Sequence, residues 1–97
     1  SLETSTSREI LSRMLNNLLT IAIQEKDAQS MLRYLDAMLA LRPDSARSHF
    51  LRMLTARQLN ESEIAKRDAR WLLIQQPSGI DLAMVKRLLQ ALEADSD

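Results

Sequence analysis

The chain has 97 residues, of which 45% are hydrophobic and 27% are charged, and its 13 basic residues balance its 13 acidic ones. This length is typical of one small domain, and the absence of net charge argues against a general nucleic-acid-binding protein, which uses excess Lys and Arg to displace counterions. The chain contains no cysteine, which excludes disulfides, thiolate metal sites and cysteine nucleophiles within it.

Targeting signals are not visible in the sequence. No apolar run approaches the ~18 residues of a membrane span, and residues 1–7 are too polar for a signal peptide. We therefore expect a cytoplasmic location. Because the chain does not begin with Met, we also expect it to be a piece of a longer protein.

The first predicted helix covers about residues 7–25. Thr6 and Glu9 have the spacing of a capping box at its start. Apolar residues then recur at the i, i+3, i+4, i+7 spacing of one buried stripe, formed by Leu11, Met14, Leu15, Leu18 and Ala22. Ile10, Ile21 and Ile23 lie toward the flanks of this helix. A preceding domain or a homodimer would cover them, and the sequence does not decide between the two.

Four more helices follow, at about residues 28–41, 46–59, 61–75 and 80–94. Asp27 is placed to cap the first of these, and Asn60 is placed to cap the third. Pro43 disfavours helical geometry at the residue before it, so it ends the helix at 28–41. Ser78 and Asp81 provide the start signal for the last helix.

The two prolines mark a repeat, because Pro77 stands 34 residues after Pro43. This is the period of the tetratricopeptide repeat, a helix–turn–helix unit that stacks on copies of itself. The chain resembles two such repeats, at about residues 12–45 and 46–79. A capping helix at 80–94 closes them, with a flexible lead-in at 1–7 and a tail at 95–97. The predicted fold is all-α, with five helices in a right-handed α-solenoid fragment.

A narrower resemblance rests on the segments RMLNNL at 13–18, LDAMLALRPD at 35–44 and DARWL at 68–72. These look like the C-terminal repeat region of bacterial transglutaminase-like proteins of the SirB type, over about residues 7–94. In that family a catalytic domain with a papain-like Cys/His/Asp site precedes the repeats. The resemblance therefore implies a non-catalytic accessory module of a larger protein, with no catalytic residue to carry over.

The first helix of each repeat lines the concave face of such a stack, and we place the candidate binding site there. Its residues are Arg13, Asn16, Thr20, Arg47, Phe50, Leu54 and Arg57. Phe50 and Leu54 would form an apolar patch flanked by arginines. This patch would hold an amphipathic helix of a partner or another domain of the parent chain. Burial of Phe50 and Leu54 in the core is an equally weighted alternative.

The alternative function is an anion- or RNA-binding helical domain. Its residues would be Arg47, Arg52, Arg57, Arg67 and Arg70. Few aromatic residues accompany them, although base stacking requires aromatics. An enzyme has less support, because no paired carboxylates, glycine-rich loop or metal-ligand cluster is visible. We expect no cofactor and no metal site, a packing or surface role for His49, and Trp71 at the edge of the core.

Overall fold

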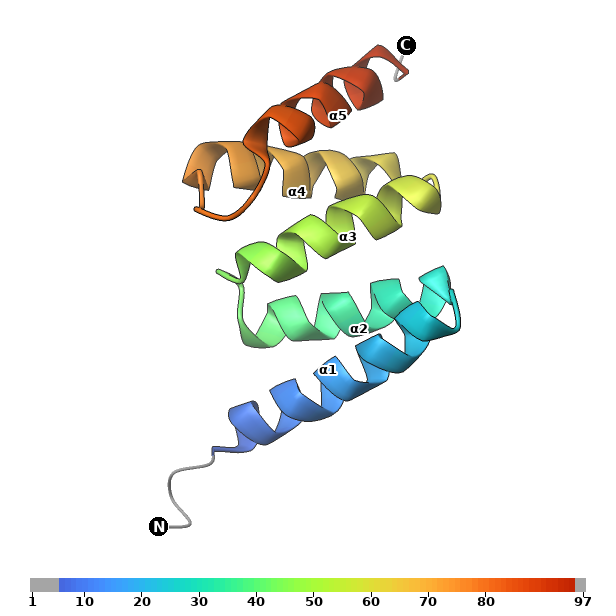
Figure 1. Cartoon of the computed structure of the whole chain (residues 1–97), viewed down its shortest axis with the longest axis vertical. Coiled ribbons are helices and arrows are strands. Elements are labelled where there is room, and N and C mark those ends of the chain that lie inside the picture. Colours follow the sequence, from blue (N-terminus) through green and yellow to red (C-terminus); the bar gives the residue numbers. More distant parts are fainter. Residues whose placement is uncertain (1–5, 96–97) are drawn as a thin grey trace.

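The computed structural model describes residues 6–95 of the chain. They form five α-helices, which are α1 (Ser7–Gln24), α2 (Ala28–Leu41), α3 (Ala46–Gln58), α4 (Ser62–Gln75) and α5 (Leu82–Ala94). Figure 1 shows the helices stacked in chain order, with α1 at one end and α5 at the other. The all-α prediction is confirmed, and each helix begins and ends within two residues of the predicted bounds. Residues 1–5 and 96–97, which belong to the predicted lead-in and tail, lie outside the described residues.

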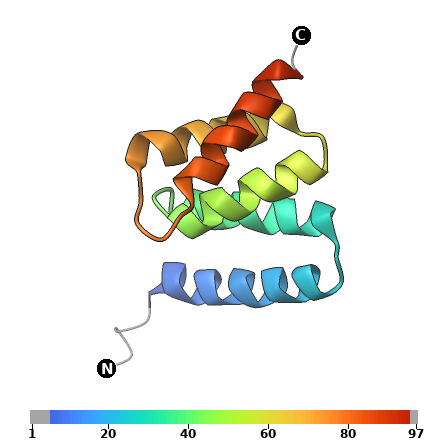
Figure 2. The ribbon, with the colours of Figure 1, turned by 45° about the horizontal axis from the view of Figure 1, so that its top comes forward.

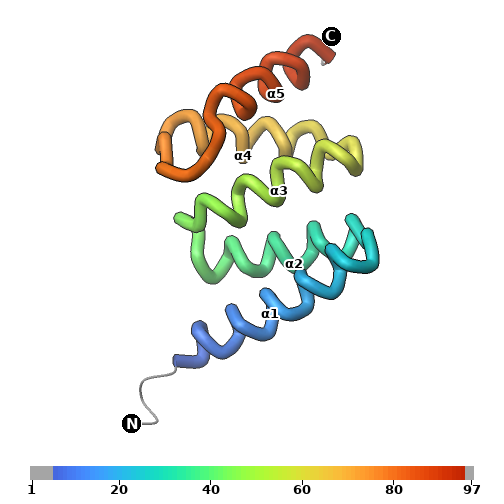
Figure 3. The backbone as a smooth tube through the Cα atoms, viewed as in Figure 1, coloured from blue at the N-terminus to red at the C-terminus, as the bar shows by residue number. Residues whose placement is uncertain are grey.

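The stack is elongated, with principal extents of 53 × 29 × 18 Å. Within residues 6–95, close backbone contacts join α1 to α2, α2 to α3, α3 to α4 and α4 to α5, and no other pair of helices. The Cα trace in Figure 3 follows this order as a continuous zigzag. Stability in such an array is close to a sum of the stabilities of its units and of nearest-neighbour contacts.

Side-chain caps fix where most of the helices begin. The Thr6 hydroxyl accepts from the Glu9 N–H, and the Glu9 carboxylate accepts from the Thr6 N–H, both at 3.1 Å, so the predicted capping box is present. Asp27 accepts from both the backbone N–H and the hydroxyl of Ser30, at 3.1 and 2.6 Å. Asp81 caps α5 in the same way through the Met84 N–H.

The predicted cap of α4 is wrong. Asn60 has a φ of 60° and lies in the turn between α3 and α4, where a left-handed backbone conformation suits its short polar side chain. Glu61 instead occupies the capping position, and it makes no side-chain hydrogen bond to the helix. The same residue preferences serve N-caps and left-handed turns, which is why the sequence alone did not separate the two roles.

The caps of α1 and α2 make stability depend on acidity. Hydrogen bonds from Thr6 lower the pKa of Glu9, and hydrogen bonds from Ser30 lower the pKa of Asp27. Each carboxyl group has a lower pKa in the folded state than in the unfolded state. It therefore stabilises the fold at pH values above the unfolded-state pKa, and this stabilisation is lost as the pH falls through the folded-state pKa. We expect the midpoint temperature of unfolding, measured by circular dichroism, to decrease as the pH is lowered below about 4. The acid slope should be shallower in a Glu9→Gln/Asp27→Asn variant, and an unchanged slope would contradict the prediction.

The predicted stripe of α1 is wrong for three of its five residues. Leu11, Met14 and Leu18 are 46%, 54% and 40% exposed, whereas Leu19 and Ala22 are buried. Because α1 makes close backbone contacts only with α2, it buries one side, and that side runs through Leu19 and Ala22. The spacing identified an apolar stripe but did not say which neighbour, if any, would cover it.

Candidate functional site

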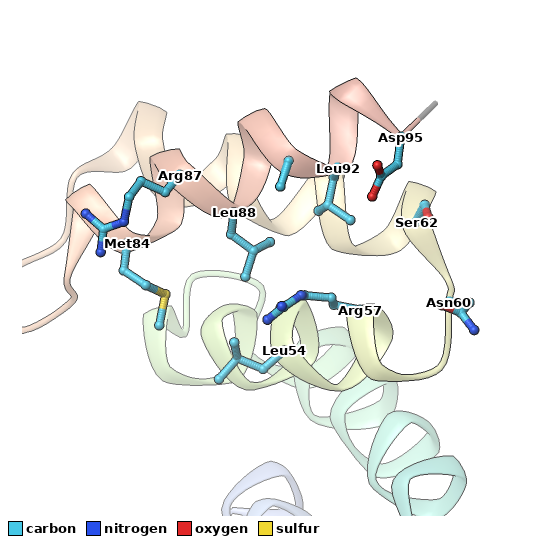
Figure 4. A pocket seen from close by; sticks show the side chains of 10 residues that line it. Leu54, Arg57, Asn60, Ser62, Met84, Arg87, Leu88, Leu92 and Asp95 are labelled. Atoms are coloured by element: carbon cyan, nitrogen blue, oxygen red, sulfur yellow. The ribbon is translucent and has the colours of Figure 1, made fainter. Parts of the chain in front are cut away.

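A groove with a cavity volume of about 590 Å³ lies between α3 and α5. We call it the α3–α5 groove, and Figure 4 shows it from close by. Its two walls point toward each other, with Leu54 and Arg57 below and side chains of α5 above. The α5 wall consists of Met84, Arg87, Leu88, Ala91 and Leu92.

Helical spacing explains how these side chains reach one surface. Leu54 and Arg57 are three residues apart on α3, and Met84, Arg87 and Leu88 follow the i, i+3, i+4 pattern on α5. Residues with this spacing are neighbours on a helix surface. The apolar floor of the groove is continuous with the core. Leu88 belongs to the buried cluster, and Leu54, Met84 and Leu92 pack against that cluster, which consists of Met53, Ala69, Leu72, Val85 and Leu88.

The chemistry of the groove is apolar in the middle and cationic at two places. Arg57 and Arg87 are exposed, and within residues 6–95 neither has a carboxylate partner within salt-bridge distance. Asp95 lies at the end of the groove nearest Ser62. Such a surface can hold apolar side chains of a ligand while two guanidinium groups bind carboxylates beside them.

The structure divides the predicted site residues between separate places. Leu54 and Arg57 line the α3–α5 groove. Phe50 and Leu54 are half-buried against the core cluster, so Leu54 contributes to both groove and core. Arg13 and Asn16 line a second hollow of about 510 Å³ between α1 and α2.

The remaining predicted residues connect to this second hollow. Arg47 donates to the Asn16 side-chain oxygen at a long 3.5 Å, and the Thr20 hydroxyl donates to the Asn16 backbone oxygen at 2.9 Å. Thr20 therefore uses its hydroxyl within its own helix. Sequence reasoning missed Met84, Arg87 and Leu88, because the helix at 80–94 was predicted only to close the stack. Their i, i+3, i+4 spacing was the available signal.

A polar network joins α2, α3 and α4. The Asp68 carboxylate on α4 accepts from Arg52 on α3 at 2.7 and 2.8 Å, and from His49 Nδ1 at 2.8 Å. Arg52 also donates to Asp36 on α2 at 3.0 Å. The hydrogen bonds to Asp68 raise the pKa of Arg52 above its ordinary value. Arg52 is thus a structural residue, not one available to an external anion.

His49 is closed to outside chemistry. Its Nε2 lies 2.7 Å from the Pro43 carbonyl oxygen, and its Nδ1 lies 2.8 Å from the Asp68 carboxylate, so both ring nitrogens are occupied by protein partners. Its ring stacks on Trp71 with centroids 3.8 Å apart. His49 lines none of the hollows described above, and its role is packing.

Arg70, like Arg52, was predicted to belong to an anion- or RNA-binding site. Its guanidinium donates a hydrogen bond to Glu93 at 3.2 Å, so a second arginine of that site already has a carboxylate partner. Within residues 6–95, no three side chains of the types His, Asp and Glu gather as a metal site would require. In the same part of the chain, each helix is too short or too polar to span a bilayer.

Comparison with known proteins agrees with the geometry. The family model of the tetratricopeptide repeat matches residues 18–90, which run from α1 into α5. No curated protein and no solved structure gave a significant match. The matched residues cover most of the chain, from the second half of α1 through α2, α3 and α4 into α5. The chain belongs to the tetratricopeptide repeat family.

Proposed function

We propose that this chain is a non-catalytic module that binds an amphipathic helix in the α3–α5 groove. Tetratricopeptide repeats generally mediate protein–protein interactions. The observation that carries the proposal is the pairing of an apolar floor with the two arginines, Arg57 and Arg87, that have no carboxylate partner. A helix in a groove contributes side chains at i, i+3, i+4 and i+7, and the floor offers apolar surface for them.

The charges of the groove define the ligand further. Carboxylates on the flanks of the bound helix would pair with Arg57 and Arg87, and each bidentate pair would add geometric specificity. Asp95 at one end of the groove would repel an acidic residue there. The ligand is thus an acidic amphipathic helix with its negative flank away from Asp95.

We further propose that this helix belongs to another domain of the same parent chain. The support is the resemblance of residues 13–18, 35–44 and 68–72 to the repeat region of bacterial SirB-type transglutaminase-like proteins. On this proposal the parent protein is bacterial and cytoplasmic and carries the catalytic domain elsewhere in its chain. The site would then hold or regulate that domain.

The groove is tested with a designed peptide helix that carries Leu at i, i+4 and i+7 and Glu on its flanks. We expect saturable NMR shifts at Leu54, Arg57, Met84 and Leu88. An Arg57→Ala/Arg87→Ala variant should bind the peptide at least ~10-fold more weakly, because both charge partners are lost. Arg67→Ala is the matched control, since Arg67 is exposed on α4 outside the groove. It should change affinity less than ~2-fold.

Two results would overturn the proposal. One is the absence of saturable shifts at high peptide concentration. The other is an equal loss of affinity in the Arg67→Ala control, which would indicate nonspecific attraction of an acidic peptide. A titration with the separately expressed remainder of the parent chain then tests whether the natural ligand lies in the same polypeptide.

A further inference from the structure

Most of the exposed large hydrophobic side chains within residues 6–95 lie on α1. Seven large hydrophobic side chains are exposed within residues 6–95, and six of them lie on α1. Four form a continuous line along the helix, which we call the α1 face, and these are Leu11, Met14, Leu18 and Ile21. Contiguous exposed apolar surface of this kind marks an interaction site in soluble proteins.

The four residues of the α1 face are spaced symmetrically along the sequence, so the order of the intervals is the same in both chain directions. Its residues are separated by three, four and three positions. In a two-fold dimer, residue i contacts residue j of the second copy, and residue j contacts residue i in return. An antiparallel second copy would therefore place Leu11 against Ile21 and Met14 against Leu18, with each contact made twice. The three–four alternation is also that of the a and d positions of a coiled coil.

Charges at the ends of α1 favour the same orientation. Arg8 lies near the start of the helix and Glu25 is its C-cap, and both are exposed. In the antiparallel pair, Glu25 of one copy lies close to Arg8 of the second copy at both ends. A parallel pair would place Arg8 beside Arg8 and Glu25 beside Glu25. Opposite charges across a helix pair set its orientation.

We propose that the chain forms a two-fold antiparallel dimer through the α1 face. This inference does not depend on the proposed groove ligand, because α1 and the α3–α5 groove lie at opposite ends of the stack. Figure 2 shows α1 as the outermost helix, with its far side clear of α3, α4 and α5. The dimer would thus carry two open grooves and bind a bivalent partner with increased avidity.

The dimer is tested by sedimentation equilibrium of the full 97-residue chain from ~1 µM to ~1 mM. We expect the mass to rise from monomer to dimer with a micromolar dissociation constant, since one helix pair gives an interface at the low end of the stable range.

Two charged variants test which surface forms the dimer, an acidic Met14→Glu/Leu18→Glu and a basic Met14→Lys/Leu18→Lys. Each alone should associate at least ~100-fold more weakly, because like charges then face each other. Their equimolar mixture should recover a dimer of one acidic and one basic chain.

The control is Ile74→Glu, which changes the most exposed large hydrophobic side chain within residues 6–95, at 76%, on α4. It should leave the dimer intact, and all variants should keep their helix content by circular dichroism because the changed residues are exposed. A monomeric mass at every concentration would overturn the proposal. So would dissociation by Ile74→Glu to the same extent, or a mixture of the two charged variants that stays monomeric.

The orientation of the two α1 helices in the dimer is tested by disulfide cross-linking, because the chain has no cysteine of its own that would interfere. A Leu11→Cys variant is mixed with an Ile21→Cys variant and oxidised under equilibrating conditions. The antiparallel dimer predicts a disulfide mainly between the two different variants. Disulfides formed only within each variant would show a parallel arrangement and overturn the antiparallel one.

Discussion

Replacing Asp68 by Ala is expected to lower the free energy of unfolding by about 3–5 kcal/mol, because it removes one partner of a buried charge pair. The Asp68 side chain is 1% exposed and that of Arg52 is 14% exposed. Without Asp68, the Arg52 guanidinium loses two hydrogen bonds and the His49 Nδ1 loses its acceptor. A domain of this size has a total stability of only about 5–15 kcal/mol, so the variant should lose a large part of it.

Urea denaturation followed by circular dichroism measures this loss directly. Asp36→Ala is the matched control, since it removes the other carboxylate on Arg52 from a side chain that is 53% exposed. An exposed ion pair contributes up to about 1 kcal/mol, so the control should remain near wild-type stability. If both variants lost the same small amount, the network would not be the stabilising feature that its geometry indicates.

Replacing Leu19 by Ala is expected to release α1 from the stack while α3 to α5 stay folded. Leu19 is fully buried, and α1 has backbone contact only with α2. Truncating a buried Leu to Ala costs about 2–5 kcal/mol. In a one-dimensional array this cost falls on a single helix interface, because no other helix shares it.

Hydrogen exchange distinguishes this local release from global unfolding. Amides of α1 should lose protection in the Leu19→Ala variant, whereas those of α4 should keep it. Ile23→Ala on the same helix is the control, because Ile23 is 41% exposed and its truncation leaves no buried cavity. Equal loss of protection in all five helices would mean that the domain unfolds as one unit and that the nearest-neighbour description is wrong.

The fold could be predicted from the sequence because its main signals are local. Pro43 and Pro77, the capping box at Thr6 and the cap at Asp27 each act within a few residues of the helix end that they fix. Such signals do not depend on what the helix packs against. Each observed helix therefore lies close to its predicted position.

The candidate site was harder to predict from the sequence, because it depends on which faces of the helices pack against each other. The spacing of Leu11, Met14 and Leu18 indicated an apolar stripe, but only the stacking order shows that no helix within residues 6–95 covers it. Arg52 and Asp68 are 16 residues apart on different helices, and no local pattern pairs them. The α5 wall of the groove was missed for the same reason.

The bonds of Arg52 also determine how the chain gains and loses structure. A stack of helices with only neighbouring contacts has low contact order, so it folds quickly and frays from its ends. Arg52 holds α2 and α4 at once, through Asp36 and Asp68, and His49 ties the same carboxylate to the turn at Pro43. We therefore expect the three middle helices to open and close together, with fraying confined mainly to α1 and α5. This unit supports both the groove at one end and the exposed helix at the other.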